Sequence, residues 1–219
     1  HLLQVRSHYN VETVNGVLMR NSAVAGAIYR SFASRFDPNV AGDREALVAK
    51  ADEGVTSGLD SVRSLAEDEV LRGLANLVRS ALRTNFFQRP ERPVISIKVE
   101  SRKVEGMASP RPLFEIYVHS RLLEGIHLRG GKVARGGIRW SDRHDDFRIE
   151  ILGLMKTQMV KNSVIVPVGS KGGFVLKGNV PSRPALDAYL IDRYREFVSG
   201  LLDVTDNLVD NKVLHPPEV

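Results

Sequence analysis

Cationic residues beside paired glycines are the first feature of this sequence that suggests chemistry. Arg135 precedes Gly136 and Gly137, and Lys171 precedes the pair at 172–173. Glycine permits positive φ and lets the backbone approach a ligand closely, so we expect both pairs to lie in turns. An arginine and a lysine held there can bind a small dianionic substrate, and the lysine can also transfer protons. These residues therefore outline a predicted pocket.

A predicted helix between the two glycine pairs carries an amide and an ammonium. Five residues share one face of it, by their spacing of three or four: Phe147, Ile151, Leu154, Gln158 and Lys161. Three positions are apolar, and the last two can jointly bind one carboxylate, the amide by hydrogen bonding and the lysine by charge. Lys161 can equally serve the helix end alone, through the C-terminal dipole. Spacing does not separate these alternatives.

The other cations also have two interpretations each. Lost hydration and neighbouring cations would favour the neutral amine of Lys171 and suit it to proton transfer, whereas a solvated lysine in a turn is the commoner case. Arg139 can hold a carboxylate or form a salt bridge to the aspartates of segment 142–146. The 6 histidines lack metal-ligand spacing, so we expect no metal site.

Hydrophobic periodicity divides the chain into a helical part and an α/β part. Helices are expected over about 10–36, 43–56, 64–83, the segment ending near 161, and 184–204. Strands are expected at 94–99, 114–118, 125–129, 163–168 and 174–176. Ser64 and Glu67 read as a capping box, and prolines at 90 and 93 mark a boundary.

The predicted fold is α/β, with a mixed sheet flanked by helices and a helical N-terminal extension. We assign 1–92 to the helical region and 93–219 to the α/β domain. The chain has 219 residues, a net charge of +5 and no cysteine, which excludes disulfides, thiolate zinc sites and a cysteine nucleophile. No apolar run is long enough to span a membrane, and no P-loop or dinucleotide fingerprint occurs.

The order G-G-x-R, Q-x-x-K and P-x-G-x-K-G-G resembles the substrate domain of glutamate dehydrogenases. Longer stretches are similar to the very large bacterial NAD-specific class. They read V-A-R-G-G-I-R-W-S-D-R-H-D-D-F-R, L-G-L-M-K-T-Q-M-V-K-N and V-I-V-P-V-G-S-K-G-G-F-V. The resemblance covers most of residues 65–219 and implies a glutamate dehydrogenase-like substrate domain at 93–219.

This resemblance implies oxidative deamination of L-glutamate to 2-oxoglutarate and ammonium, with hydride passing to NAD. Lys171 falls on the family's catalytic lysine, which polarises the carbonyl and activates water. Gln158 and Lys161 fall on the pair that binds the substrate α-carboxylate.

Three further positions match the family's pocket. Arg135 stands where smaller relatives have a lysine that meets the side-chain carboxylate, which keeps the charge and changes the geometry. Gly136 and Gly137 match glycines that line the pocket.

The resemblance also implies parts that this chain lacks. We expect the catalytic aspartate and the NAD-binding domain beyond Val219, so the chain alone should be inactive. It further implies a cytoplasmic homo-oligomer with neither nucleic acid nor membrane as partner. The alternative from another class is a non-catalytic module that binds anions or nucleic acid, which the basic charge would favour.

Overall fold

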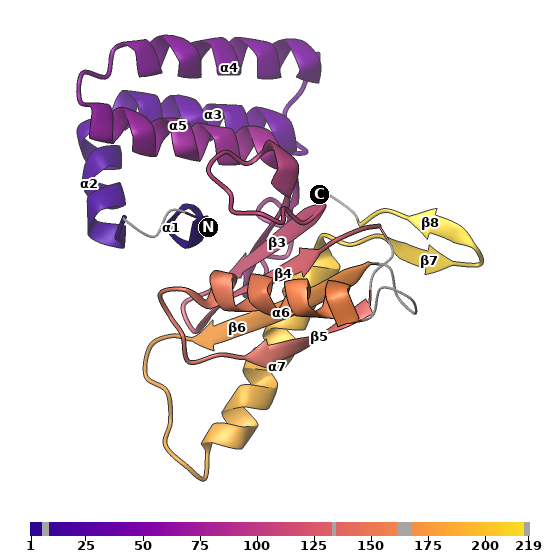
Figure 1. Cartoon of the computed structure of the whole chain (residues 1–219). Helices are drawn as coiled ribbons and strands as arrows, with labels where there is room; N and C mark the ends of the chain where they lie inside the picture. The colour runs from indigo at the N-terminus through magenta and orange to yellow at the C-terminus, as the bar shows by residue number, and fades with distance from the viewer. Residues whose placement is uncertain (6–8, 133–134, 162–167, 217–219) are drawn as a thin grey trace.

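The structure is a computed structural model that describes residues 1–5, 9–132, 135–161 and 168–216, with the backbone alone at 135 and 159–161. Helices α1–α5 gather at one end of the molecule, and a sheet with two helices forms the other (Figure 1). The predicted α/β fold with a mixed sheet and a helical N-terminal extension is confirmed.

The helical region buries one apolar core, to which Val17, Val55 and Leu71 contribute. Its helices are α1 (Leu2–Val5), α2 (Val11–Arg20), α3 (Ser22–Phe36), α4 (Arg44–Asp60) and α5 (Leu65–Ser80). The single helical segment predicted over 10–36 is two helices, because Asn21 leaves helical geometry between them. The Asn21 amide donates to Glu67 at 2.8 Å and so ties this break to α5.

Helix α5 begins as predicted and ends early. The Ser64 hydroxyl accepts from the Glu67 amide at 3.5 Å, but the Glu67 carboxylate accepts from Arg20 and Asn21, so half of the capping box forms. The helix stops at Ser80, and residues 81–84 pair with the neighbouring strand of the sheet. The helix predicted to residue 83 is therefore wrong in its last residues.

The sheet has six strands in the order β1-β2-β3-β4-β6-β5. The strands are β1 (Ala81–Thr84), β2 (Ile95–Glu100), β3 (Phe114–His119), β4 (Leu123–Arg129), β5 (Arg135–Trp140) and β6 (Gly169–Leu176). All neighbours run antiparallel except β5 and β6, which are parallel. Residues 163–167 of one predicted strand lie outside the described residues.

Both glycine pairs lie inside strands, so the predicted glycine turns are wrong. The first pair falls in β5 and the second in β6. A Cβ on Gly136 would lie only 1.5 Å from the Ser170 carbonyl oxygen. Glycine is needed there for close approach between strands rather than for a turn.

One helix covers each face of this sheet (Figure 1). Helix α6 (Phe147–Lys161) buries Phe147 and Ile151 against β4 and β6, and α7 (Leu186–Asp203) buries Phe197 against the opposite face. The remaining short elements are the 3-10 turn η1 (Ser101–Lys103) and the hairpin of β7 (Asn207–Val209) and β8 (Lys212–Leu214). The two residues of the hairpin turn both have positive φ, at 50° and 61°.

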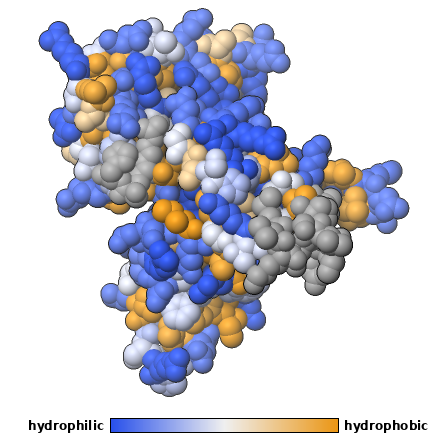
Figure 2. Space-filling model, viewed as in Figure 1, coloured by the Kyte–Doolittle hydropathy of each residue, from blue (hydrophilic) through white to orange (hydrophobic). Residues whose placement is uncertain are grey.

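The surface mixes hydrophilic and apolar residues on the face seen in Figure 2. Apolar side chains that remain exposed include Ile149 on α6 and Ile191 on α7. None of the described helices combines the length and the apolar character needed to cross a membrane.

Candidate functional site

The candidate site is built on one β5–α6–β6 unit. Parallel neighbours need a crossover connection, and α6 supplies it on one face of the sheet. The strands pair in register from Arg135 with Gly169 to Trp140 with Phe174. This pairing places two segments that lie 34 residues apart in the chain side by side.

Lys171 lies directly beside the first glycine pair. Gly137 is its register partner across the parallel strands. A Cβ on Gly137 would lie 4.0 Å from the Lys171 ammonium nitrogen, so the amine stands over that glycine on the α6 side of the sheet. Lys171 is half-buried. Without side-chain bulk at position 137, the space next to the amine stays open for a small molecule.

Gln158 reaches the same face from α6. A Cβ on Gly169 would lie 2.9 Å from the Gln158 side-chain oxygen. Gly169 is two residues before Lys171 in β6, and strand residues two apart face the same side. The structure therefore brings Gln158 and Lys171 to one patch of the sheet under α6.

Two predicted residues take part in this unit by their backbone. Arg135 is the first residue of β5, paired with Gly169, and Lys161 is the last residue of α6. Their side chains lie outside the part of the chain that the structure describes. Their contacts with a substrate stay predictions.

Arg139 is engaged in a salt bridge, but not with the aspartates considered from the sequence. Its guanidinium lies 3.1 Å from the Glu150 carboxylate in α6. Asp146 instead pairs with Arg143. The sequence interpretation missed Glu150 because it searched the segment before the helix rather than the first turn inside it. Arg139 thus links β5 to α6.

A buried ion pair that sequence reasoning missed also holds the N-terminal end of α6. Arg148 and Glu115 are 2% and 0% exposed, and the Arg148 Nε donates to Glu115 at 3.0 Å, with a second bond from its other nitrogen. The His1 ring lies 3.1 Å from the same carboxylate. One feature of the sequence could have indicated it. Arg148 is adjacent to Phe147, which lies on the apolar face of a predicted helix, so a buried position for the arginine was possible.

Electrostatics separate the two faces of the sheet. Burial alone would raise the pKa of Glu115, but hydrogen bonds from His1 and Arg148, and their charges, bring that pKa below its ordinary value. On the opposite face, burial and then Arg129 lower the pKa of His127 to about 4. Glu115 is therefore a buried carboxylate, whereas His127 is neutral at physiological pH.

A family model described as "Bacterial NAD-glutamate dehydrogenase, catalytic domain" matches residues 54–219. The chain belongs to this family. Most of the match covers the sheet, α6 and α7, so the β5–α6–β6 unit lies within the bacterial NAD-glutamate dehydrogenase catalytic domain.

Three relatives match this catalytic-domain chain over its whole length. The NAD-specific glutamate dehydrogenases of Pseudomonas aeruginosa and Mycobacterium tuberculosis are each 43% identical to it, and that of Halomonas elongata is 42% identical. The chain spans 14% of the length of each relative.

Proposed function

We propose that this chain is the substrate-binding part of an NAD-dependent glutamate dehydrogenase, which converts L-glutamate to 2-oxoglutarate and ammonium. Family membership supports the reaction class. The observation that carries the assignment to this site is the Lys171 ammonium, which stands over Gly137 on the face that also receives Gln158. A cation and an amide share that face, and a dicarboxylate needs both charge and hydrogen-bond donors.

Each group receives a role in this proposal. The Gln158 amide donates to the substrate α-carboxylate, together with Lys161 at the end of the same helix. Lys171 acts on the reacting carbon, where it polarises the carbonyl of the product and exchanges a proton with water. Arg135 meets the side-chain carboxylate from the first position of β5. Gly137 keeps β5 free of a side chain beside the substrate, and Gly136 lets β5 lie close to Ser170 of β6.

NAD serves as the hydride acceptor in the proposed reaction. In residues 1–5, 9–132, 135–161 and 168–216 the glycine pairs lie inside β5 and β6, not between a strand and the N-terminus of a helix. That arrangement does not fit a dinucleotide phosphate cradle. We therefore assign NAD binding to another part of the protein. The family resemblance further supports a cytoplasmic homo-oligomer.

Steady-state kinetics with glutamate and NAD on the full-length protein test the role of Lys171. Lys171→Ala should lose at least roughly 10²–10⁴-fold in kcat, the usual scale for proton-transfer catalysis. Lys171→Arg should not restore turnover, because a guanidinium stays protonated. Lys156→Ala is the matched control, since Lys156 is an exposed lysine of α6. If Lys171→Ala raised KM and kept kcat within a few-fold, the lysine would bind substrate and would not carry the chemistry.

A second measurement separates this function from anion binding in general. Calorimetric titration of the full-length protein with 2-oxoglutarate should show saturable binding that Gln158→Ala weakens. Titration with a short DNA duplex should show none. Binding of the duplex, with no binding of 2-oxoglutarate, would favour the nucleic-acid alternative.

A further inference from the structure

Helix α1 is one turn of helix that contacts both parts of the molecule. Leu2 is buried in the apolar core of the helical region. Gln4, two residues later, is 9% exposed and points toward the start of α6. Figure 1 places α1 between the bundle of α3 and α5 and the sheet. A short element anchored on one side and bonded on the other can transmit the position of the helical region to α6.

Gln4 supplies three hydrogen bonds to the start of α6. Its side-chain oxygen accepts from the backbone amide of Arg148 at 3.3 Å. Its nitrogen donates to the carbonyls of His144 and Asp145 at 3.3 and 3.4 Å. The first amides of a helix have no partner within the helix, so a side chain from elsewhere that satisfies one also fixes where the helix begins.

The Glu115–Arg148 pair adds a second restraint at the same place. Its two bonds join the first turn of α6 to β3, and the His1 ring from the start of the chain contacts the same carboxylate. The planar guanidinium fork permits one orientation against a carboxylate, so the pair restrains rotation as well as distance. The N-terminal end of α6 is therefore held by α1 and by β3 together.

We propose that Gln4 is a positioning residue, which sets the start of α6 and thereby the placement of Gln158 beside Lys171. This inference rests on the proposed function. Gln158 is ten residues after Arg148 in one uninterrupted helix, about 15 Å along its axis. A rigid helix converts a small shift or rotation at its start into a displacement of Gln158. Displacements on the order of 1 Å in a substrate-binding group are enough to change catalysis.

Removal of the Gln4 amide should move α6 without unfolding it. Phe147, Ile151 and Met155 are each 1% exposed or less, and they pack α6 onto the sheet independently of α1. The Glu115–Arg148 pair also remains. The apolar contacts thus stabilise the helix and its packing on the sheet, whereas Gln4 sets the position of its first turn.

The test is steady-state kinetics on the full-length protein, with glutamate varied. Gln4→Leu keeps the side-chain size and removes all three bonds. We expect KM for glutamate to rise about 5-fold, the scale of a weakened hydrogen bond to substrate, with kcat within twofold. In Gln158→Ala, the further change Gln4→Leu should raise KM less than it does in the original protein, because one of the two substrate-binding groups that α6 carries is already gone.

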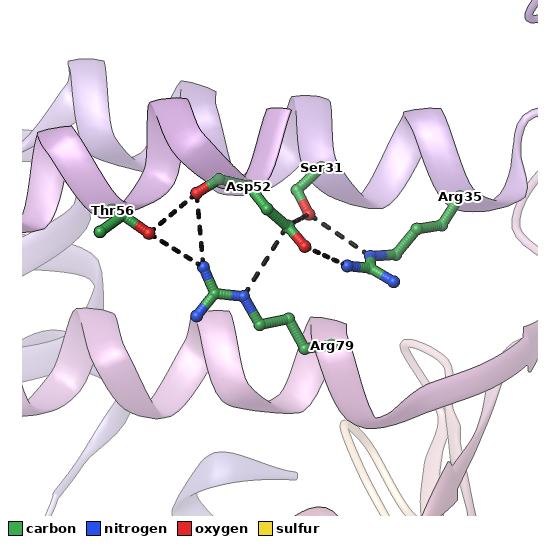
Figure 3. Close-up of polar contacts among 5 residues, drawn as sticks. All are labelled: Ser31, Arg35, Asp52, Thr56 and Arg79. Atoms are coloured by element: carbon green, nitrogen blue, oxygen red, sulfur yellow. Dashed lines mark hydrogen bonds and ion pairs between the residues drawn. The ribbon is translucent and has the colours of Figure 1, made fainter. Parts of the chain in front are cut away.

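Asp52→Asn is the matched control for a lost polar contact in the helical region. Asp52 accepts from the Ser31 hydroxyl at 2.6 Å and pairs with Arg35 and Arg79, between α3, α4 and α5 (Figure 3). None of these residues belongs to α1 or α6. This variant should lower thermal stability and leave KM unchanged, which separates positioning from general loss of stability.

The outcomes distinguish the two proposals. If Gln158→Ala raises KM and Gln4→Leu does not, the positioning role is overturned and the proposed function stands. If the effects of the two substitutions on KM multiply in the double variant, Gln4 acts by another route, which also overturns this inference. If Gln158→Ala itself leaves KM unchanged, the role of Gln158 in the proposed function fails, and this inference fails with it.

Discussion

Alanine at position 136 should separate the two strands that carry the candidate site, whereas alanine at 137 should not. A Cβ on Gly136 would lie 1.5 Å from the Ser170 carbonyl oxygen, and non-bonded carbon and oxygen atoms stay at least about 3.3 Å apart. Strand β5 must therefore withdraw from β6 by roughly 2 Å, which breaks the adjacent backbone hydrogen bonds. At about 1 kcal/mol each, the loss of two to three such bonds lowers the free energy of unfolding by about 2–3 kcal/mol.

Gly137→Ala is the matched control, because the two glycines are neighbours in one strand. The nearest atom to a Cβ added at Gly137 is the Lys171 side-chain nitrogen at 4.0 Å, an ordinary van der Waals distance. The free energy of unfolding should then stay within about 0.5 kcal/mol of the original value. Under the proposed function, the added methyl group occupies space beside the reacting amine, so kcat/KM for glutamate should fall by about 10-fold.

Guanidinium unfolding of the 219-residue chain, followed by circular dichroism, measures the stability of both variants. Hydrogen exchange should show faster exchange at the amides of β5 and β6 in Gly136→Ala and original rates in Gly137→Ala. Equal unfolding midpoints for Gly136→Ala and the original chain would refute the close approach of β5 to Ser170. Equal damage from both substitutions would mean that glycine is needed for its backbone freedom rather than for space.

Three further predictions concern two titratable groups and the activity of the isolated chain. The pKa of His127 is about 4 in the fold and 6.5 in the unfolded chain, so the stability this group contributes is present above pH 6.5 and lost as the pH falls toward 4. Unfolding measured across that pH range should show a loss of about 3 kcal/mol in the original chain. The same measurement on His127→Gln should show no such loss. Glu115→Leu leaves the Arg148 guanidinium buried and unpaired and should lower the free energy of unfolding by about 3–5 kcal/mol, whereas Glu115→Leu with Arg148→Met should cost less than the single change. The purified 219-residue chain should form no NADH from glutamate and NAD, because the glycine pairs in the described residues do not form a binding site for the dinucleotide phosphates. Measurable NADH formation would contradict this.

The sequence predicted those helices and strands whose hydrophobic pattern has only one structural explanation. Helix α6 and helix α7 follow from apolar residues at helical spacing, and both end within a few residues of the expected positions. The antiparallel strands β2, β3 and β4 follow from alternation. Burial of one face produces these patterns, and the sheet and its covering helices bury those faces.

Each glycine pair has two possible structural explanations, and the sequence does not distinguish between them. Glycine serves both where φ is positive and where another backbone approaches too closely for a Cβ. The second reason applies to Gly136, and the atom that requires it, the Ser170 carbonyl, belongs to a strand whose pairing with β5 the local sequence does not specify. The prediction of turns took the first reason, and it was wrong because both pairs lie in strands.

The buried contacts of Glu115 with Arg148 and His1 were missed for a related reason. Alternation in β3 assigns Glu115 to the face opposite Ile116 and Val118, and an acidic residue on such a face usually meets solvent. Here Glu115 contacts Arg148 of α6 and His1, which precedes α1, and these residues lie 33 and 114 positions away. Periodicity shows that a strand has two faces, but not what will cover the second one.

The location of the candidate residues within one β5–α6–β6 unit explains why the sequence could group them before their geometry was known. The unit is continuous in sequence, so the groups that meet in space, Gly137, Gln158 and Lys171, also follow one another along the chain within a single motif. Their distances, however, depend on how α6 is seated on the sheet, and that depends on Gln4 and Glu115, which lie outside the unit. The candidate residues are thus grouped by local sequence, whereas their alignment is set by the rest of the fold.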